Sequence, residues 1–191
     1  MTITWKHLVV IALVLVGAYF VYVNWISSID PTRTVKDLLN DYCQGDMADA
    51  EVAKRSLLAK AEQQEDCWVE LVKYSTLPDP KARELCVIAL AETRNRRKEV
   101  WQALIVALKD DNEEVRWQAA KAFRKILVHQ AIEPLMKALD DDSQYVVTAA
   151  HLTLKSLTRE VWPADRKAWE DWWIEGKNRL VIREEEPGWT D

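Results

Sequence analysis

Two stretches of the chain decide its fold: LIVALKDDNEEVRWQAAKAF, from Leu104 to Phe123, and LMKALDDDSQYVVTAAHLTL, from Leu135 to Leu154. They align at an offset of 31 residues, with apolar or small residues in matching places and an aspartate-containing turn between them. Apolar residues recur three and four apart on either side of the turn, which is the helical period. Self-similarity at a fixed period indicates a repeat architecture. We therefore expect repeated pairs of helices.

The same pattern continues toward the N-terminus at an offset of 33 residues. Asp49 and Ser56 make the first unit the weakest match, because they occupy positions that are apolar or small elsewhere. Five positions are apolar in every unit: Val35, Trp68, Trp101 and Ile132; Leu38, Leu71, Leu104 and Leu135; Leu39, Val72, Ile105 and Met136; Ala53, Cys86, Ala119 and Ala150; Leu57, Leu90, Phe123 and Leu154.

Helix-start signals agree with four units of two helices each. Asp79-Pro80 provides an N-cap followed by a proline at the first helical position. Asp111, with Glu114 three residues later, reads as an aspartate version of the capping box. Asp142 or Ser143 opens the last helix of the series. The predicted helices span 33–43, 47–62, 66–76, 80–93, 98–109, 112–127, 131–139 and 143–158.

The segment VRWQAAKAF, from Val115 to Phe123, resembles the second helix of the HEAT-repeat family, especially its short bacterial, PBS-lyase-like units. The resemblance covers residues 65–158 well and 33–62 loosely. It implies an all-α fold, an α-solenoid of four helical hairpins over 33–158. It also implies that Arg83 and Arg116 have a structural role, each bonding an aspartate in a neighbouring turn.

Four tryptophans follow the last repeat, at Trp162, Trp169, Trp172 and Trp173. The last three share one face of a helix predicted from Ala164 to Glu175. Because an exposed solenoid end must be capped, we expect residues 159–178 to form a Trp-rich capping segment. The alternative is a docking surface, since tryptophan is enriched at interface hot spots. Residues 179–191 are expected to be a flexible acidic tail.

The N-terminal segment Leu8 to Ile26 contains 19 residues without a formal charge. As a helix it would be about 28 Å long, close to the roughly 30 Å hydrocarbon core of a bilayer. Residues 1–28 are therefore predicted to be a transmembrane anchor, with the helical domain on the extracytoplasmic side, in a bacterial inner membrane. A signal peptide cleaved after Val16-Gly17-Ala18 and a buried core helix remain the alternatives.

Composition disfavours a nucleic-acid binder. Beyond residue 26 the chain carries 25 basic and 31 acidic side chains, a net of −6. An acidic domain gains little from phosphate contacts.

The sequence shows no catalytic, cofactor-binding or metal-ligating pattern. The three histidines, His7, His129 and His151, have no ligand spacing with one another or with the cysteines. Glycine-rich phosphate loops and a G-x-S-x-G elbow are missing. No bond is expected between Cys43 and Cys67, and Cys86 should be buried like an alanine.

These observations favour a non-enzymatic adaptor, scaffold or assembly factor without cofactors. Its partner would be a protein, itself membrane-associated, and Leu8 to Ile26 would contact the lipid bilayer. The alternative is a lyase-like or ligand-handling protein of the bilin-lyase type. The resemblance places the second helices on the concave side, near Arg83, Glu113 and Gln144, but no site residue is assigned.

Overall fold

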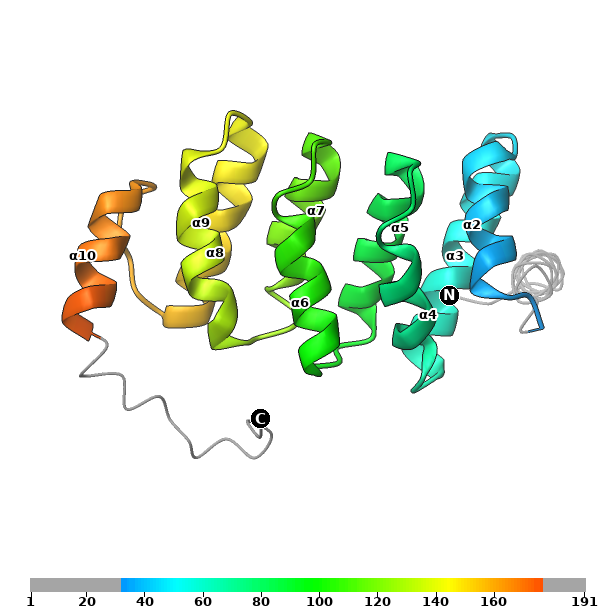
Figure 1. Cartoon of the computed structure of the whole chain (residues 1–191), viewed down its shortest axis with the longest axis horizontal. Helices are drawn as coiled ribbons and strands as arrows, with labels where there is room; N and C mark the ends of the chain where they lie inside the picture. The colour runs from blue at the N-terminus through cyan, green and yellow to red at the C-terminus, as the bar shows by residue number, and fades with distance from the viewer. Residues whose placement is uncertain (1–31, 177–191) are drawn as a thin grey trace, which may run out of the picture.

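The computed structural model describes residues 32–176. Within that range the chain forms nine α-helices, two short 3₁₀ helices and no strand, stacked as helical pairs along one axis (Figure 1). This arrangement is that of an α-solenoid. The pairs are α2 (Val35–Gln44) with α3 (Met47–Gln63), α4 (Cys67–Tyr74) with α5 (Pro80–Glu92), α6 (Lys98–Ala107) with α7 (Glu113–Ala122), and α8 (Ile132–Lys137) with α9 (Gln144–Thr158).

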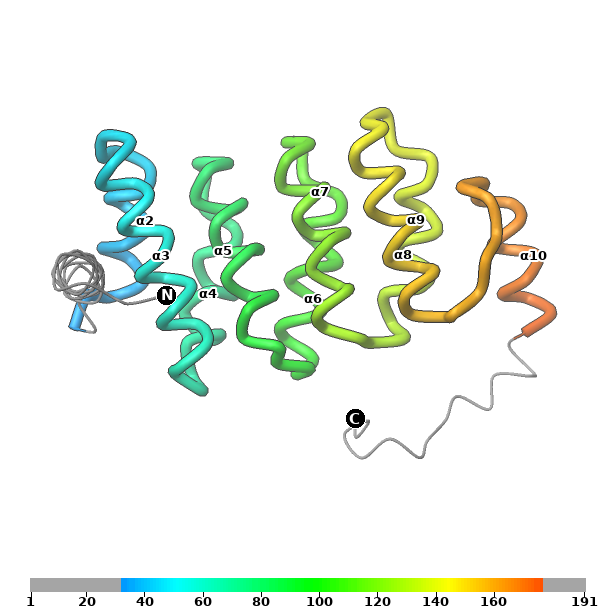
Figure 2. Tube along the Cα trace, turned by 180° about the vertical axis from the view of Figure 1, so that it is seen from behind, coloured from blue at the N-terminus to red at the C-terminus, as the bar shows by residue number. Residues whose placement is uncertain are grey.

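The four pairs, here called units one to four, build two layers. The first helices α2, α4, α6 and α8 form one layer, and the second helices α3, α5, α7 and α9 form the other (Figure 2). Neighbouring second helices pack directly on one another from α3 to α9. Each unit therefore buries its apolar face against its neighbours, as a repeat protein requires.

Three of the five predicted apolar positions are fully buried in every unit. These are the leucine position of the first helices, the small position of the second helices, and the position that holds Leu57, Leu90, Phe123 and Leu154. The other two are only half-buried in units two and three, at Trp68, Trp101, Val72 and Ile105. The small side chains at the small position of the second helices let adjacent second helices approach closely.

The helix starts agree with the sequence at α5 but not at α7. Asp79 accepts a hydrogen bond from the Lys81 backbone N–H, and Pro80 follows it. The predicted Asp111 cap is wrong: Asn112 is the N-cap of α7 and accepts from the backbone of Glu114 and Val115. The helix thus begins one residue later than a cap at Asp111 implies.

Two predicted helices are too long. The helix predicted over 112–127 ends at Ala122, after which the chain makes tight turns and then η1 (His129–Ala131). The helix predicted over 131–139 divides into α8 and η2 (Ala138–Asp140). Both units therefore lose a turn of α-helix near their ends.

Helix α10 (Arg166–Gly176) lies against the last unit and packs on α8. Trp169 is fully buried, and its Nε1 donates to the Pro163 carbonyl at 2.9 Å. Its ring meets His151 edge-on at 6.3 Å between centroids. Trp172 and Trp173 are half-buried, and Trp173 donates to Glu133 at 3.0 Å. One face of α10 therefore covers the end of the solenoid.

Among residues 32–176, no helix is both long and apolar enough to cross a membrane. The segment Leu8 to Ile26, predicted to be the anchor, and the predicted tail 179–191 lie outside the described residues.

Candidate functional site

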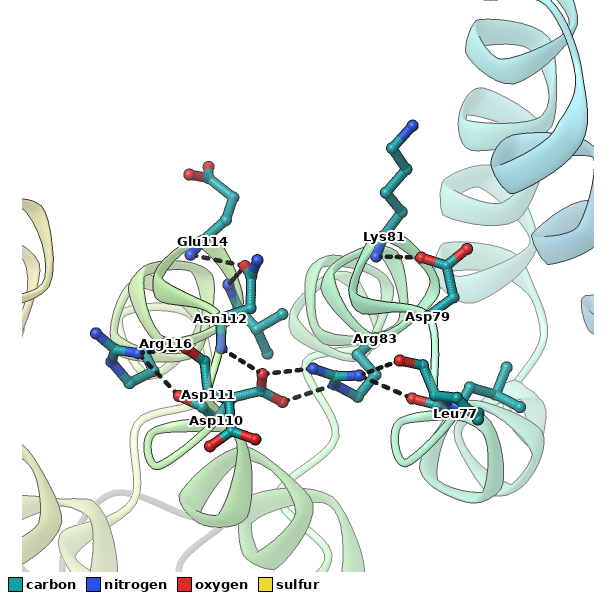
Figure 3. A network of polar contacts seen from close by, with 11 residues as sticks. Leu77, Asp79, Lys81, Arg83, Asp110, Asp111, Asn112, Glu114 and Arg116 are labelled. Carbon is teal, nitrogen blue, oxygen red and sulfur yellow. Dashed lines mark hydrogen bonds and ion pairs between the residues drawn. The ribbon is translucent and has the colours of Figure 1, made fainter.

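Arg83 joins the turn of its own unit to the turn of the next one (Figure 3). Its Nε and Nη2 donate to the two carboxylate oxygens of Asp110, both at 2.7 Å. Its Nη1 donates to the carbonyls of Leu77 and Pro78. One planar guanidinium thereby fixes two turns, a geometry that lysine cannot reproduce.

Arg116 repeats this arrangement one unit later. It donates to both carboxylate oxygens of Asp141, at 2.8 and 3.0 Å, and to the carbonyls of Asp110 and Asp111. A further bond reaches Asp142. Asp110 and Asp141 in turn accept the backbone N–H two residues on, at Asn112 and Ser143. We call these two linkages the arginine ladder.

The electrostatics of the ladder favour its charged form. Burial would raise the pKa of Asp110 and of Asp141, but hydrogen bonds from Arg83 and Arg116 outweigh it and leave both pKa values lowered. All three nitrogens of each guanidinium donate within the fold. The predicted structural role of Arg83 and Arg116 is therefore confirmed, and neither arginine offers a site for a ligand.

The candidate surface for a partner lies on the second helices. We define the second-helix face by three rows of structurally matching positions that are nowhere fully buried: Ala48, Lys81, Glu114 and Tyr145; Glu51, Glu84, Trp117 and Thr148; Arg55, Ile88, Lys121 and Leu152. Three acidic and three basic residues make its formal charge zero.

The first three units supply the charged part of this face. Burial, and then repulsion from Glu114, raises the pKa of Glu84, while Gln118 lies 3.5 Å from its carboxylate. Burial, and next the charge of Glu84, also raises the pKa of Tyr42 beside it. Glu84 thus occupies a partly dehydrated position near the charge of Glu114.

Trp117 lies at the centre of the face. The Lys121 ammonium is 3.8 Å from its ring centroid, a cation–π contact. The aromatic face of this tryptophan is therefore already occupied, although the side chain remains half-exposed.

The fourth unit supplies the apolar part of the second-helix face. Tyr145 is 71% exposed and Leu152 is 45% exposed. The chain after α9 folds back onto this helix, because His151 Nε2, next to Leu152, lies 2.7 Å from the carbonyl of Trp162. Val161 and Trp162 are also exposed there. We call Tyr145, Leu152, Val161 and Trp162 the apolar end; exposed aromatic and aliphatic groups of this kind mark interaction surfaces.

The first helices expose less apolar surface. Val69 on α4 and Val106 on α6 are the large exposed apolar side chains there among the described residues. Trp68 on the same layer is covered in part by the Arg97 guanidinium, 5.4 Å from its ring centroid.

The cysteines are all free thiols in the described part of the chain. Burial raises the pKa of Cys43 and of Cys67 to about 11 and that of Cys86 to about 12. They stay protonated at neutral pH and are poor nucleophiles. The prediction that Cys86 is buried like an alanine is confirmed, since it is 0% exposed.

Between residues 32 and 176, no group of three histidine, cysteine or carboxylate side chains could hold a metal ion. Burial lowers the pKa of His129, which favours its neutral form.

The structure separates the three residues that the sequence placed near the concave side. Arg83 belongs to the ladder, whereas Glu113 and Gln144 are exposed at the first turns of α7 and α9. The apolar end was not predicted. Tyr145 and Leu152 occupy positions that are charged in unit three, at Glu114 and Lys121, and this change of character was the available signal.

Stacked helical hairpins with a buried small position define a class, the α-solenoid repeat proteins. Within it, the family model for HEAT repeats matches residues 70–155, from α4 to α9. This match supports a HEAT-repeat family for units two to four, and such repeats generally mediate interactions between proteins. Unit one lies outside the match, in line with its weaker pattern. No curated protein matches the chain.

Proposed function

We propose that this protein is a membrane-anchored, non-enzymatic adaptor that holds another protein on its second-helix face. The observation that carries the proposal is the apolar end, where Tyr145 and Leu152 stand exposed. Large exposed apolar groups rimmed by charges are typical of protein-binding surfaces. The acidic and basic groups of units one to three supply that rim.

The anchor part of the proposal rests on the uncharged segment Leu8 to Ile26. A protein confined to a bilayer meets membrane-associated partners at a raised effective concentration, so a modest interface is sufficient. A membrane-associated partner is therefore favoured over a freely diffusing one. In this proposal the solenoid lies on the extracytoplasmic side of a bacterial inner membrane.

The first experiment is affinity purification of the full-length protein in mild detergent, with mass spectrometry of what stays bound. We expect a stoichiometric protein companion. The variant Tyr145→Ala/Leu152→Ala should lose it, because truncated hot-spot side chains cost more than 1 kcal/mol each at a real interface. The matched control is Val69→Ala/Val106→Ala on the first helices, which should retain it.

The outcomes separate the proposals. Loss of the companion in the control but not in the test variant would move the binding surface to the first helices. A protein that purifies alone with a bound small molecule would replace the adaptor with a ligand-handling role. If the protein were found in the aqueous fraction without detergent, the proposal of a membrane anchor would be wrong.

A further inference from the structure

Basic side chains gather at the edge where the second helices end. Because α5, α7 and α9 lie side by side, their C-terminal ends meet along one edge of the solenoid, the lower edge in Figure 1. The loops there contain seven exposed basic residues, here called the basic edge: Arg94, Arg96, Arg97, Lys98, Arg124, Lys125 and Arg159.

The acidic groups at this edge do not cancel the basic ones. Glu92 is paired with Lys125, and Glu99, Glu133 and Glu160 are the other acidic side chains beside the three loops. Helix C-termini attract a cation in the last turn, but four basic residues within 94–98 exceed what one helix end requires. Unit one differs, because Glu62, Glu65 and Asp66 make its part of the edge acidic.

The opposite edge is rich in carboxylates. It holds the turns that join first to second helices, with the carboxylates Asp46, Asp79, Asp110, Asp111, Asp140, Asp141 and Asp142. Four of these carboxylates, Asp110, Asp140, Asp141 and Asp142, are paired with arginines at the same edge. A nucleic acid bound at the basic edge would have its phosphates repelled by the acidic remainder of the protein.

The chain enters the solenoid in unit one, at the same edge of the solenoid as the basic loops. First helices run opposite to second helices, so α2 begins at the edge where α5, α7 and α9 end (Figure 1). Only residues 27–34 separate Ile26 from the first residue of α2. Eight residues span at most about 27 Å when fully extended. A bilayer that holds Leu8 to Ile26 is thus kept close to this edge.

We propose that the basic edge binds anionic lipid headgroups of the bilayer that holds the chain's own N-terminal segment. Basic residues beside a membrane span are attracted to anionic lipids. With the edge on the lipid, the helices stand away from the membrane and the second-helix face stays open to its partner. This inference rests on the proposed anchor.

The test uses the full-length protein in lipid nanodiscs, either with about 30% phosphatidylglycerol or with phosphatidylcholine alone, and measures amide hydrogen exchange. Each basic residue near an anionic membrane surface raises the affinity for that surface about fivefold. We therefore expect peptides covering 93–98 and 123–129 to exchange at least about fivefold more slowly in the anionic discs. Added salt at 1 M should abolish the difference, since it screens charges beyond about 3 Å.

The variant Arg94→Asn/Lys98→Gln/Arg124→Gln should lose this protection. Asparagine tolerates the left-handed backbone of residue 94, whose φ is 49°. The matched control, Lys73→Gln/Lys109→Gln/Lys137→Gln, removes the same charge from exposed residues at the opposite edge, outside the second-helix face. It should keep the protection.

Equal exchange in both kinds of disc would overturn the basic edge and leave the anchor intact. Equal loss of protection in the test and control variants would also overturn it, because net charge alone would then explain the effect. A chain that enters neither disc would overturn the anchor and the edge together.

Discussion

At the residue scale, the guanidinium of Arg116 has five hydrogen bonds within the fold. Arg116→Met leaves Asp141, whose side chain is 10% exposed, without its charged partner. We expect a loss of about 3 kcal/mol in the free energy of unfolding, measured by urea denaturation. Arg116→Lys should recover little of it, because an ammonium cannot donate to both carboxylate oxygens in this geometry.

The control for Arg116 is Arg166, which pairs with Asp140 and Glu170 at the surface. Arg166→Met should cost less than about 1 kcal/mol, since exposed ion pairs contribute little. Equal costs at Arg116 and Arg166 would contradict the structural role of the ladder.

The ladder also makes the free energy of unfolding depend on pH. The pKa values of Asp110 and Asp141 are lowered by folding, so their contribution is complete above the unfolded value near 4 and is lost as the pH falls through the folded values. We expect the free energy of unfolding to decrease from about pH 5 to pH 3. The double variant Arg83→Met/Arg116→Met should show a flatter dependence when the same titration is followed by urea denaturation. An unchanged slope would show that other carboxylates dominate.

Single residues also show what could not be read from the sequence. Asp111 and Asn112 are both good N-cap residues. The choice between them depends on Arg83, which holds Asp110 from a different unit and so sets where the turn ends. Exposure at Tyr145 and Leu152 likewise depends on what lies over α9, which a helical period does not report.

At the scale of the element, we expect substitutions of two N-cap residues to differ in their effect on stability. Asn112 accepts two backbone N–H groups at the start of α7. Ser143 stands at the start of α9, but its side chain makes no cap bond, and its buried hydroxyl has no hydrogen-bond partner among the described residues. Asn112→Ala should cost about 1 kcal/mol. Ser143→Ala should change stability by less than about 0.5 kcal/mol, because it removes an unsatisfied polar group. Thermal unfolding of both variants measures the contrast, and equal losses would refute it.

The contact between α10 and unit four depends on one side chain. Trp169→Ala removes a fully buried ring and should cost about 3–5 kcal/mol. Trp173→Ala removes a half-buried ring and one hydrogen bond to Glu133, so its cost should be well below that of Trp169→Ala. Urea denaturation ranks the two, and the reverse order would mean that α10 does not cap the solenoid as described.

Helices were predictable here because the repeat averages the signal over four units. Each period has an apolar position, a small position and a turn, and these recur whatever the local exceptions. The ends of α7 and α8 were less predictable, because apolar residues after Ala122, such as Ile126 and Val128, are buried in turns and still look helical in the sequence.

At the scale of the whole molecule, the ladder stops before unit one. The position that matches Arg83 holds Ala50, and the position that matches Asp110 holds Leu77. Both partners are missing together. The interface between units one and two therefore lacks the arginine–aspartate linkage that joins unit two to unit three and unit three to unit four. In a linear repeat array, stability is a sum of unit and interface contributions. Unit one should therefore open first.

The last prediction extends the ladder by one step. Ala50→Arg/Leu77→Asp places a guanidinium and a carboxylate at positions equivalent to those of Arg83 and Asp110. A charge-assisted pair of this geometry should couple by about 1–3 kcal/mol in a double-mutant cycle, whereas each single variant leaves a charge without its partner and should destabilise. Amide exchange in α3 should slow in the double variant, while exchange in α9 stays unchanged because unit four is not a neighbour. If the two substitutions were additive, the ladder would depend on surroundings that only the inner units provide, and the early opening of unit one would need another cause.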